Sequence, residues 1–315
     1  MALQKEIWIN DIQENLYKNN DFMTRSMDDS GFAISYKTIH VPQAGANAAV
    51  VADRSSFPGT ITQRTDTELT YNMVQYSADP FLITDLDSLQ VSYDKRKSVM
   101  GQFIDTLSEV VGNKTLYAWA PSGAATRTVL TTGSDVSNAL APSATGTRKA
   151  LTLTDILGAK AILDKDAGVP QAGRVMVIPS DIYNFQLLAI ADVYQKQSYG
   201  ESALPTGSVM RIFGFDVYVR PTVVVYAPGS PVTAPTIKAT NDSGTPSSPA
   251  ATDCLGILCY HPNFVSRALG TINVAHSTYD QNPEYYGDIM SAYVMHGASK
   301  RRSDGKGVAV IVQAA

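Results

Sequence analysis

Residues 174–183 read RVMVIPSDIY, and residues 207–219 read GSVMRIFGFDVYV. The first segment opens on an apolar run that predicts a short buried strand, and its Pro-Ser-Asp predicts the start of a helix that runs to about Asp192. In the second segment, two β-prone runs flank Gly214, which predicts a pair of strands that ends at Pro221. These elements predict a domain in which strands and helices are mixed.

The flanking residues continue this mixed pattern. Thr152 or Thr154 is placed to cap the next helix. An Asp-Gly pair predicts a turn at 303–307, and segments rich in small and polar residues predict surface loops at 121–150 and 227–252. Apolar runs predict further strands at residues 255–260, 268–275, 288–296 and 308–312. Because helices and strands do not alternate regularly, we predict an α+β fold.

The longest predicted element is a helix from about Asp85 to Ala118. There is no Pro between Phe81 and Ala120, and some thirty helical residues would span about 45 Å. The sequence leaves open an earlier end at Gly112, because Gly costs about 1 kcal/mol inside a helix. One apolar stripe at helical spacing is formed by Val99, Met100, Phe103, Ile104, Leu107, Val110 and Val111.

The first forty residues are predicted to form an arm. Asp11 and Glu14 have the spacing of a capping box and predict a short helix, and residues 34–41 alternate as in a half-buried strand. Residues 42–80 are rich in Gly, Ala, Ser, Pro and Thr, and they predict a long two-stranded excursion. An isolated hairpin is marginally stable in water, so we expect this excursion to rest on a neighbouring chain.

The composition argues against several classes of protein. The 315 residues hold 25 Lys and Arg and 29 Asp and Glu, and this net charge of -4 argues against a surface that binds nucleic acid throughout. The charged first twenty residues lack the apolar run of a signal peptide, and no apolar segment is long enough to span a bilayer. Two cysteines cannot form a disulfide framework. We expect a soluble protein that is made in a reducing cytosol and has no membrane partner.

One group of residues offers the ligand types that zinc prefers. Cys254, Cys259 and His261 lie close together in the sequence. Their spacing fits no zinc knuckle, and a strand would place Cys254 on the face opposite the other two. We therefore expect two small buried thiols and no metal site.

Three other motifs are incomplete. The GESAL sequence at 200–204 lacks the second Gly of a nucleophile elbow. The Gly305–Gly307 segment lacks the upstream Gly and the following Ser or Thr of a phosphate-binding loop, so we predict a turn there. Asp85, Asp87 and Asp94 lie at the predicted start of the long helix, where acidic side chains interact favourably with the positive end of the helix dipole. We predict no catalytic or cofactor-binding residues and no enzyme.

The order of these elements resembles that of a tailed-bacteriophage major capsid protein. The resemblance is carried by the strand, helix, loop and Gly-Phe-x-Val-Tyr pattern of 174–219, by GDIMSAYVMHG at 287–297 and by RRSDGKGVA at 301–309. It implies the Hong Kong ninety-seven fold, which encapsulin shells share. A compartment shell like encapsulin, or a phage tail-tube protein, is the alternative function.

The resemblance also implies a division of the chain. Residues 1–40 would be the N-terminal arm, and residues 41–83 the extended loop. Residues 84–150 would form the peripheral domain with its spine helix, and residues 151–265 the axial domain. Residues 266–315 would return to the peripheral domain as strands.

The implied partners are many copies of the chain itself, arranged as hexamers and pentamers in an icosahedral shell. A separate scaffolding protein, a portal, a decoration protein and non-specifically held double-stranded DNA are also implied, with assembly in the bacterial cytoplasm and a final place in the virion. Some relatives crosslink a Lys of the extended loop to a neighbour. No Lys lies between Pro42 and Tyr93, so we expect a shell held by non-covalent contacts.

Seven residues are candidates for contacts between subunits. Arg54 and Arg64 are expected to meet acidic groups of an adjacent subunit, and the apolar Phe57 and Pro58 to dock into it. The basic cluster beside the predicted turn is expected to be solvated or to meet acids of another subunit, with nucleic acid as the alternative. This cluster is Lys300, Arg301 and Arg302.

Overall fold

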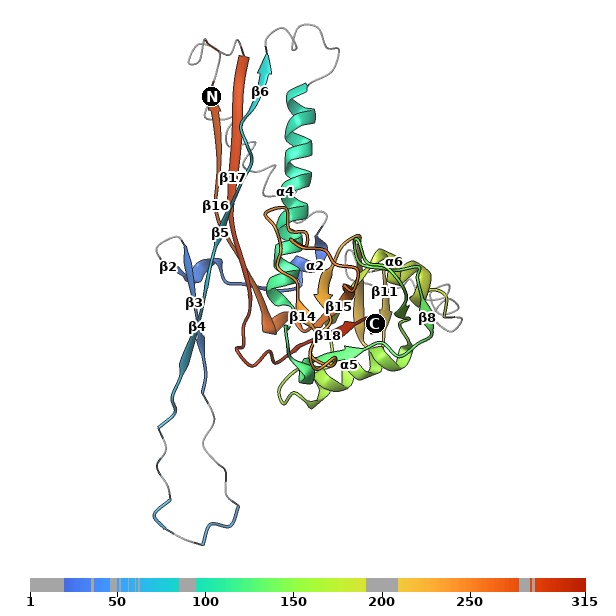
Figure 1. The fold of residues 1–315 in the computed structure, drawn as a ribbon. Coiled ribbons are helices and arrows are strands. Elements are labelled where there is room, and N and C mark those ends of the chain that lie inside the picture. The colour runs from blue at the N-terminus through green and yellow to red at the C-terminus, as the bar shows by residue number, and fades with distance from the viewer. Residues whose placement is uncertain are drawn as a thin grey trace.

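The computed structural model describes residues 20–34, 37–45, 50, 52–55, 57–59, 61, 63–84, 95–190, 209–277, 284 and 287–315. Figure 1 shows these residues as a compact body, an elongated body and a long hairpin that projects away from both. The predicted helix at Asp11, the GESAL segment at 200–204 and the three aspartates between Asp85 and Asp94 lie outside the described residues.

The compact body is built on an eight-stranded sheet in the order β11-β12-β10-β15-β13-β14, with β18 beside β15 and β7 beside β18. The predicted strand pair around Gly214 is confirmed, since β11 and β12 are antiparallel and Gly214 takes a φ of 89° in the turn. The strands are β7 Thr128–Leu130, β10 Arg174–Pro179, β11 Met210–Ile212, β12 Phe215–Arg220, β13 Val224–Ala227, β14 Thr236–Ile237, β15 Cys254–Tyr260 and β18 Val308–Val312.

Both faces of this sheet are covered. On β10, Val175 and Val177 belong to one buried apolar cluster, and Met176 and Ile178 belong to another on the opposite face. A strand buried on both faces needs apolar residues at every position, which explains the uninterrupted apolar run at 174–178.

Helix α5, Leu153–Lys165, covers one face and lies below the sheet in Figure 1. Thr152 is its N-cap: the Thr152 hydroxyl accepts the Asp155 N–H, and the Asp155 carboxylate accepts the Thr152 N–H at 2.8 Å. The helix predicted after Pro179 begins as α6, Ser180–Ile182, and continues as the π-helical turn η3, Tyr183–Leu187.

The elongated body joins helix α4, Lys95–Trp119, to a five-stranded sheet. Helix α4 continues through Gly112 and does not end there. Only glycine fits at this position, because a Cβ would lie 2.3 Å from Oδ1 of Asn20 and 2.6 Å from Nη1 of Arg220. The predicted strands at 268–275 and 288–296 are confirmed inside longer ones. The sheet contains β1 Met27–Asp28, β5 Val74–Ser77, β6 Phe81–Thr84, β16 Val265–Ser277 and β17 Gly287–Lys300.

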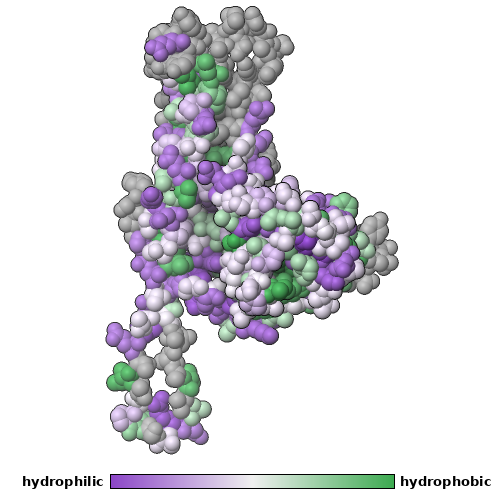
Figure 2. Space-filling model, in the orientation of Figure 1, coloured by the Kyte–Doolittle hydropathy of each residue, from purple (hydrophilic) through white to green (hydrophobic). Residues whose placement is uncertain are grey.

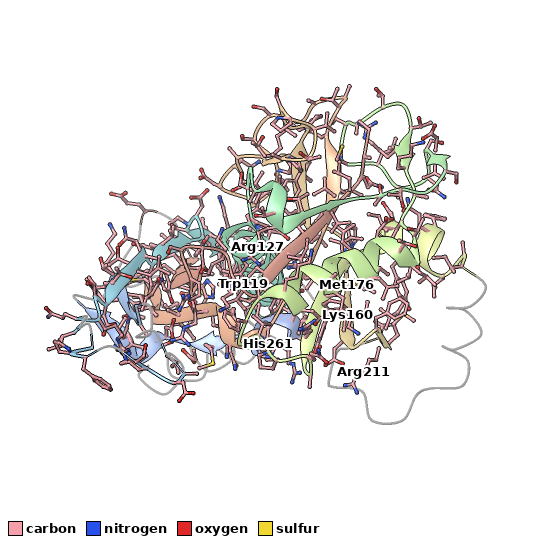
Figure 3. The ribbon with its side chains drawn as sticks, turned by 90° about the horizontal axis from the view of Figure 1, so that it is seen from below. Trp119, Arg127, Lys160, Met176, Arg211 and His261 are labelled. Atoms are coloured by element: carbon pink, nitrogen blue, oxygen red, sulfur yellow. The ribbon has the colours of Figure 1, made fainter. Side chains whose placement is uncertain are left out.

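Trp119 lies where the two bodies meet, as Figure 3 shows. Its ring packs edge-on against Phe22 of the short helix α2, Asp21–Thr24, at 5.9 Å, and against Tyr260 of β15 at 5.1 Å. Its Nε1–H donates to the Ser266 carbonyl at 2.9 Å, so a single side chain contacts the arm and both sheets.

Two segments differ from the prediction. The prediction that 121–150 is a loop is wrong, because β7 lies there, parallel to β18. The 227–252 segment is a loop apart from β14, and it packs on α4, where the Lys114 ammonium donates to the Thr240 hydroxyl at 2.9 Å. Sheet pairing also divides the expected range 266–315, since β16 and β17 belong to the elongated body and β18 to the compact one.

His296 of β17 is buried between the sheet and α4. Burial, with the charge of Arg267 as the second cause, lowers the pKa of its imidazole to about 3, although Asp28 acts in the opposite direction. His296 also lines a cavity of about 200 Å³ with Lys114 and Tyr76. The folded protein therefore holds this imidazole neutral where an unfolded chain would protonate it.

We predict that Thr152→Ala lowers the free energy of unfolding by about 1 kcal/mol, because it removes the N-cap of α5. Thr154 is exposed on the same helix, so Thr154→Ala is the control, with an expected change below about 0.5 kcal/mol. Urea unfolding measures both variants. Equal effects of the two substitutions would contradict the assignment of the cap.

We predict that His296→Leu makes the protein less sensitive to acid. The pKa of His296 is about 3 in the folded protein, and its ordinary value is 6.5. Between these two pH values the imidazole is protonated in the unfolded chain and neutral in the folded one, so stability is lost as the pH falls from about 6.5 to about 3. The variant should reduce the pH slope of the unfolding free energy by up to about 1.4 kcal/mol per pH unit. Urea unfolding at about pH 4 and about pH 6 measures the slope. An unchanged slope in His296→Leu would refute the prediction.

Candidate functional site

The structure contains an extended hairpin in the region of the expected two-stranded excursion, but the hairpin begins at Thr38, before the predicted start at residue 42, and residues 74–77 pair with β17 instead. Strand β3, Thr38–Gln43, pairs antiparallel with β4, Thr67–Asn72, with Val41 opposite Leu69. The short strand β2, Ala33–Ile34, adds to the outer side of β3. Figure 1 shows the connecting loop reaching far beyond both bodies, so its described residues gain little burial from their own subunit.

The loop of this hairpin carries exposed apolar side chains, which Figure 2 shows on both of its sides. Val50 is 97 % exposed, Phe57 is 80 % exposed and Ile61 is 98 % exposed. Pro58 is also exposed. Burying a side chain of this size stabilises a complex by about 1.5–3 kcal/mol, so the loop gains free energy when another surface covers it.

The two arginines of the loop differ in their surroundings. The Arg64 guanidinium donates to both carboxylate oxygens of Asp66, from Nε to Oδ1 at 2.7 Å and from Nη2 to Oδ2 at 2.8 Å. This hydrogen bonding lowers the pKa of Asp66. Arg54 is exposed and makes no ion pair within the described part of the chain. The contact of either arginine with a neighbouring subunit stays a prediction.

The base of the hairpin is tied to the body around Asp29, a carboxylate that is 1 % exposed. The Tyr71 hydroxyl of β4 donates to it at 3.4 Å, and the Arg301 guanidinium lies 3.5 Å from its other oxygen. Ser266 of β16 donates to the Tyr71 oxygen at 3.3 Å. Four segments that are distant in the sequence thus meet at one buried charge.

The basic cluster at the end of β17 makes its contacts within this chain. The Lys300 ammonium donates to the Ala120 carbonyl at 3.2 Å, directly after the C-terminus of α4, where a cation is favoured. Burial lowers the pKa of Lys300. Arg302 lies 3.7 Å from Asp304, and the Arg301 carbonyl accepts the Gln43 side chain at 3.0 Å. A role of this cluster between subunits stays a prediction.

Met73, between β4 and β5, fixes the direction in which the hairpin leaves the sheet. It is buried against two glycines of the long strands: a Cβ at Gly297 would lie 3.1 Å from Met73 Cγ, and one at Gly270 would lie 3.1 Å from Met73 Sδ. Asp29, Tyr71 and Met73 are not among the residues that the sequence pattern indicated. The available signal was Gly270, inside the predicted strand at 268–275, and Gly297, directly after the predicted strand at 288–296, since glycine in a strand marks the close approach of another segment.

The residues with the chemistry of metal or phosphate ligands take part in the packing and hydrogen bonding of the fold. Cys254 and Cys259 belong to apolar clusters on opposite faces of the compact sheet, and burial raises the pKa of Cys259 to about 12. His261 accepts the Asn263 N–H at 3.2 Å. The Gly307 N–H donates to the Asp166 carboxylate at 3.0 Å.

Two kinds of feature are absent from the described ranges. No group of three or more His, Cys, Asp or Glu side chains there has the arrangement of a metal site. No described helix is both long enough and apolar enough to cross a membrane.

No family model matches the chain, and no curated protein matches it. Solved structures do match. The capsid of Ralstonia phage GP4 aligns with a TM-score of 0.60 and 12 % identity, over 92 % of this chain and 86 % of that one. The capsid of cyanophage P-SCSP1u aligns with a TM-score of 0.57 and 18 % identity, over 91 % and 84 %. A virus-like particle from Pyrococcus furiosus aligns with a TM-score of 0.51 and 7 % identity, over 98 % of both chains.

These alignments cover 91 % or more of the chain. At such low identities they establish the fold and nothing finer. The α+β fold implied by the order of the elements is therefore confirmed: this chain has the fold of phage capsid proteins, the Hong Kong ninety-seven fold.

Proposed function

We propose that this chain is the major capsid protein of a tailed bacteriophage. It assembles as hexamers and pentamers into an icosahedral shell that encloses double-stranded DNA. The observation that carries the proposal is the extended hairpin, whose loop exposes Val50, Phe57 and Ile61 almost completely, on a subunit with the capsid fold. Repeated contacts between neighbouring copies would bury these side chains.

The net charge supports the same function. With a net charge of -4, the subunit would not hold the phosphates of packaged DNA tightly, so DNA contacts would be non-specific. A scaffolding protein, a portal and a decoration protein are the further partners of such a shell. The mature protein would be found in the virion, after assembly in the bacterial cytoplasm, and would catalyse no reaction.

A second candidate is an encapsulin-like compartment shell, which would enclose protein in place of a genome. The alignment with the virus-like particle of Pyrococcus furiosus over the full chain favours keeping this candidate. The two functions share the subunit fold and differ in the contents of the particle.

Electron microscopy of the expressed protein, alone and with phage lysate, tests the proposal. Closed particles of uniform diameter are expected, and DNA in particles formed with lysate separates a virus from a compartment, in which one protein would copurify. Tubes would move the protein to the phage tail. Subunits that stay monomeric when a scaffold is supplied would refute both shell functions.

We predict that Phe57→Ser reduces the yield of particles by about tenfold and leaves the single subunit intact. Phe57 is 80 % exposed, so its loss should change the subunit's unfolding free energy by less than about 0.5 kcal/mol. Each contact between subunits would lose about 1.5–3 kcal/mol of apolar burial. Quantitative sedimentation measures the yield, and urea unfolding measures the subunit.

Val232→Ser is the matched control, because Val232 is also an exposed apolar side chain, 62 % exposed, on a loop of the compact body. It should assemble as the unchanged protein does. Full particle yield with Phe57→Ser would remove the loop tip from the contacts between subunits.

A further inference from the structure

Among the described residues, no strand pairs with the edge of β5 that faces away from β17. Its register with β17 places Gln75 opposite Met295 and Ser77 opposite Tyr293, and the Ala78 N–H donates to the Ala292 carbonyl at 3.0 Å. Main-chain groups of successive residues point to opposite sides of a strand. The N–H and C=O groups of Gln75 and Ser77 therefore point away from β17, and no described residue bonds to them.

A groove runs along this edge and has a volume of about 640 Å³. Its first wall is the β5 segment from Val74 to Asp79, which at about 3.3 Å per residue is roughly 20 Å long. Leu107 and Val110 of α4 contribute to the second wall, and Asp242 of the 227–252 loop contributes to the third. Residues from both faces of β5 line the groove, which is expected when it follows the edge of the strand and not one face.

The chemistry of the groove selects its occupant. Tyr76 and Leu107 give the groove apolar surface, and two exposed carboxylates, Asp79 and Asp242, line it without an ion pair among the described residues. Lys114, the lysine among its described lining residues, already donates to Thr240. An unpaired strand edge beside this groove fits an extended segment with apolar side chains and basic residues.

We infer that the groove between β5 and α4 binds an extended basic strand of a separate partner polypeptide. The strand adds to β5 through the main-chain groups of Gln75 and Ser77, and its basic side chains meet Asp79 and Asp242. A separate partner fits better than a second copy, because the extended segment of this chain, residues 42–80, holds two Arg against four Asp and Glu and is therefore not a basic strand. The inference stands whether or not the chain forms a phage capsid.

The first test uses a fluorescein-labelled peptide of sequence Lys-Val-Thr-Val-Thr-Lys and the full-length protein. Fluorescence anisotropy should show saturable binding that weakens as salt is added, because exposed ion pairs are screened. The same peptide with Glu at both ends should not bind. Absence of saturable binding by the Lys peptide, or equal binding by the Glu peptide, would overturn the inference.

The second test places the peptide on the edge of β5. Ser77→Pro removes an N–H that points away from β17, so the strand keeps its pairing with β17, and the peptide should bind about tenfold more weakly. Ser77→Ala keeps the N–H and is the matched control, with unchanged binding expected. Wild-type affinity in a folded Ser77→Pro variant would place the peptide elsewhere and overturn the inference.

A third variant keeps the test valid if Ser77→Pro does not fold. Asp79→Asn combined with Asp242→Asn leaves the main chain unchanged and should weaken binding of the Lys peptide by about threefold or more. Unchanged affinity in this variant would count against the inference. Analytical ultracentrifugation of the free protein completes the design: dimers that the peptide dissociates would assign the edge to a second copy and overturn the choice of a separate partner.

Discussion

The packing of Trp119 between Phe22 and Tyr260 holds the parts of this subunit together. The three rings belong to α4, the arm and the compact sheet, and the Tyr260 hydroxyl also donates to the Phe22 carbonyl at 2.8 Å. Because aromatic side chains bury large areas, this contact fixes the compact body against the elongated one. The orientation of α4, and with it the surface on which β17 and the 227–252 loop pack, depends on this contact.

Stability is distributed unevenly around this centre. The compact sheet is covered on both faces, whereas the extended hairpin is held mainly at its base, through the buried Asp29 and through Met73. A segment with few buried apolar contacts is the first to open in a folded protein. The hairpin therefore combines a firmly positioned base with a loop whose exposed apolar residues Val50, Phe57 and Ile61 gain little burial within the subunit.

The sequence was sufficient wherever burial alone decides the structure. The apolar runs at 174–178 and 308–312 predicted strands correctly, because both faces of the sheet demand apolar residues. It was insufficient for β7, which has three residues and exists only because β18, far along the chain, pairs with it. The contact of four segments around Asp29 could not be predicted for the same reason, since no local pattern indicates that segments distant in the sequence meet. The loop residues Phe57 and Arg64 were identified as surface candidates, but one chain does not contain the partner that would define their role.

The position of β18 in the sheet affects how the subunit is made. This strand lies between β15 and β7, and β7 leaves the ribosome about 180 residues earlier. Until residue 312 has emerged, both neighbouring strands have an open edge, and nascent chains with open edges are prone to aggregate. The compact sheet is therefore completed late in translation. A truncated chain without β18 lacks the completed sheet that a subunit needs to join others.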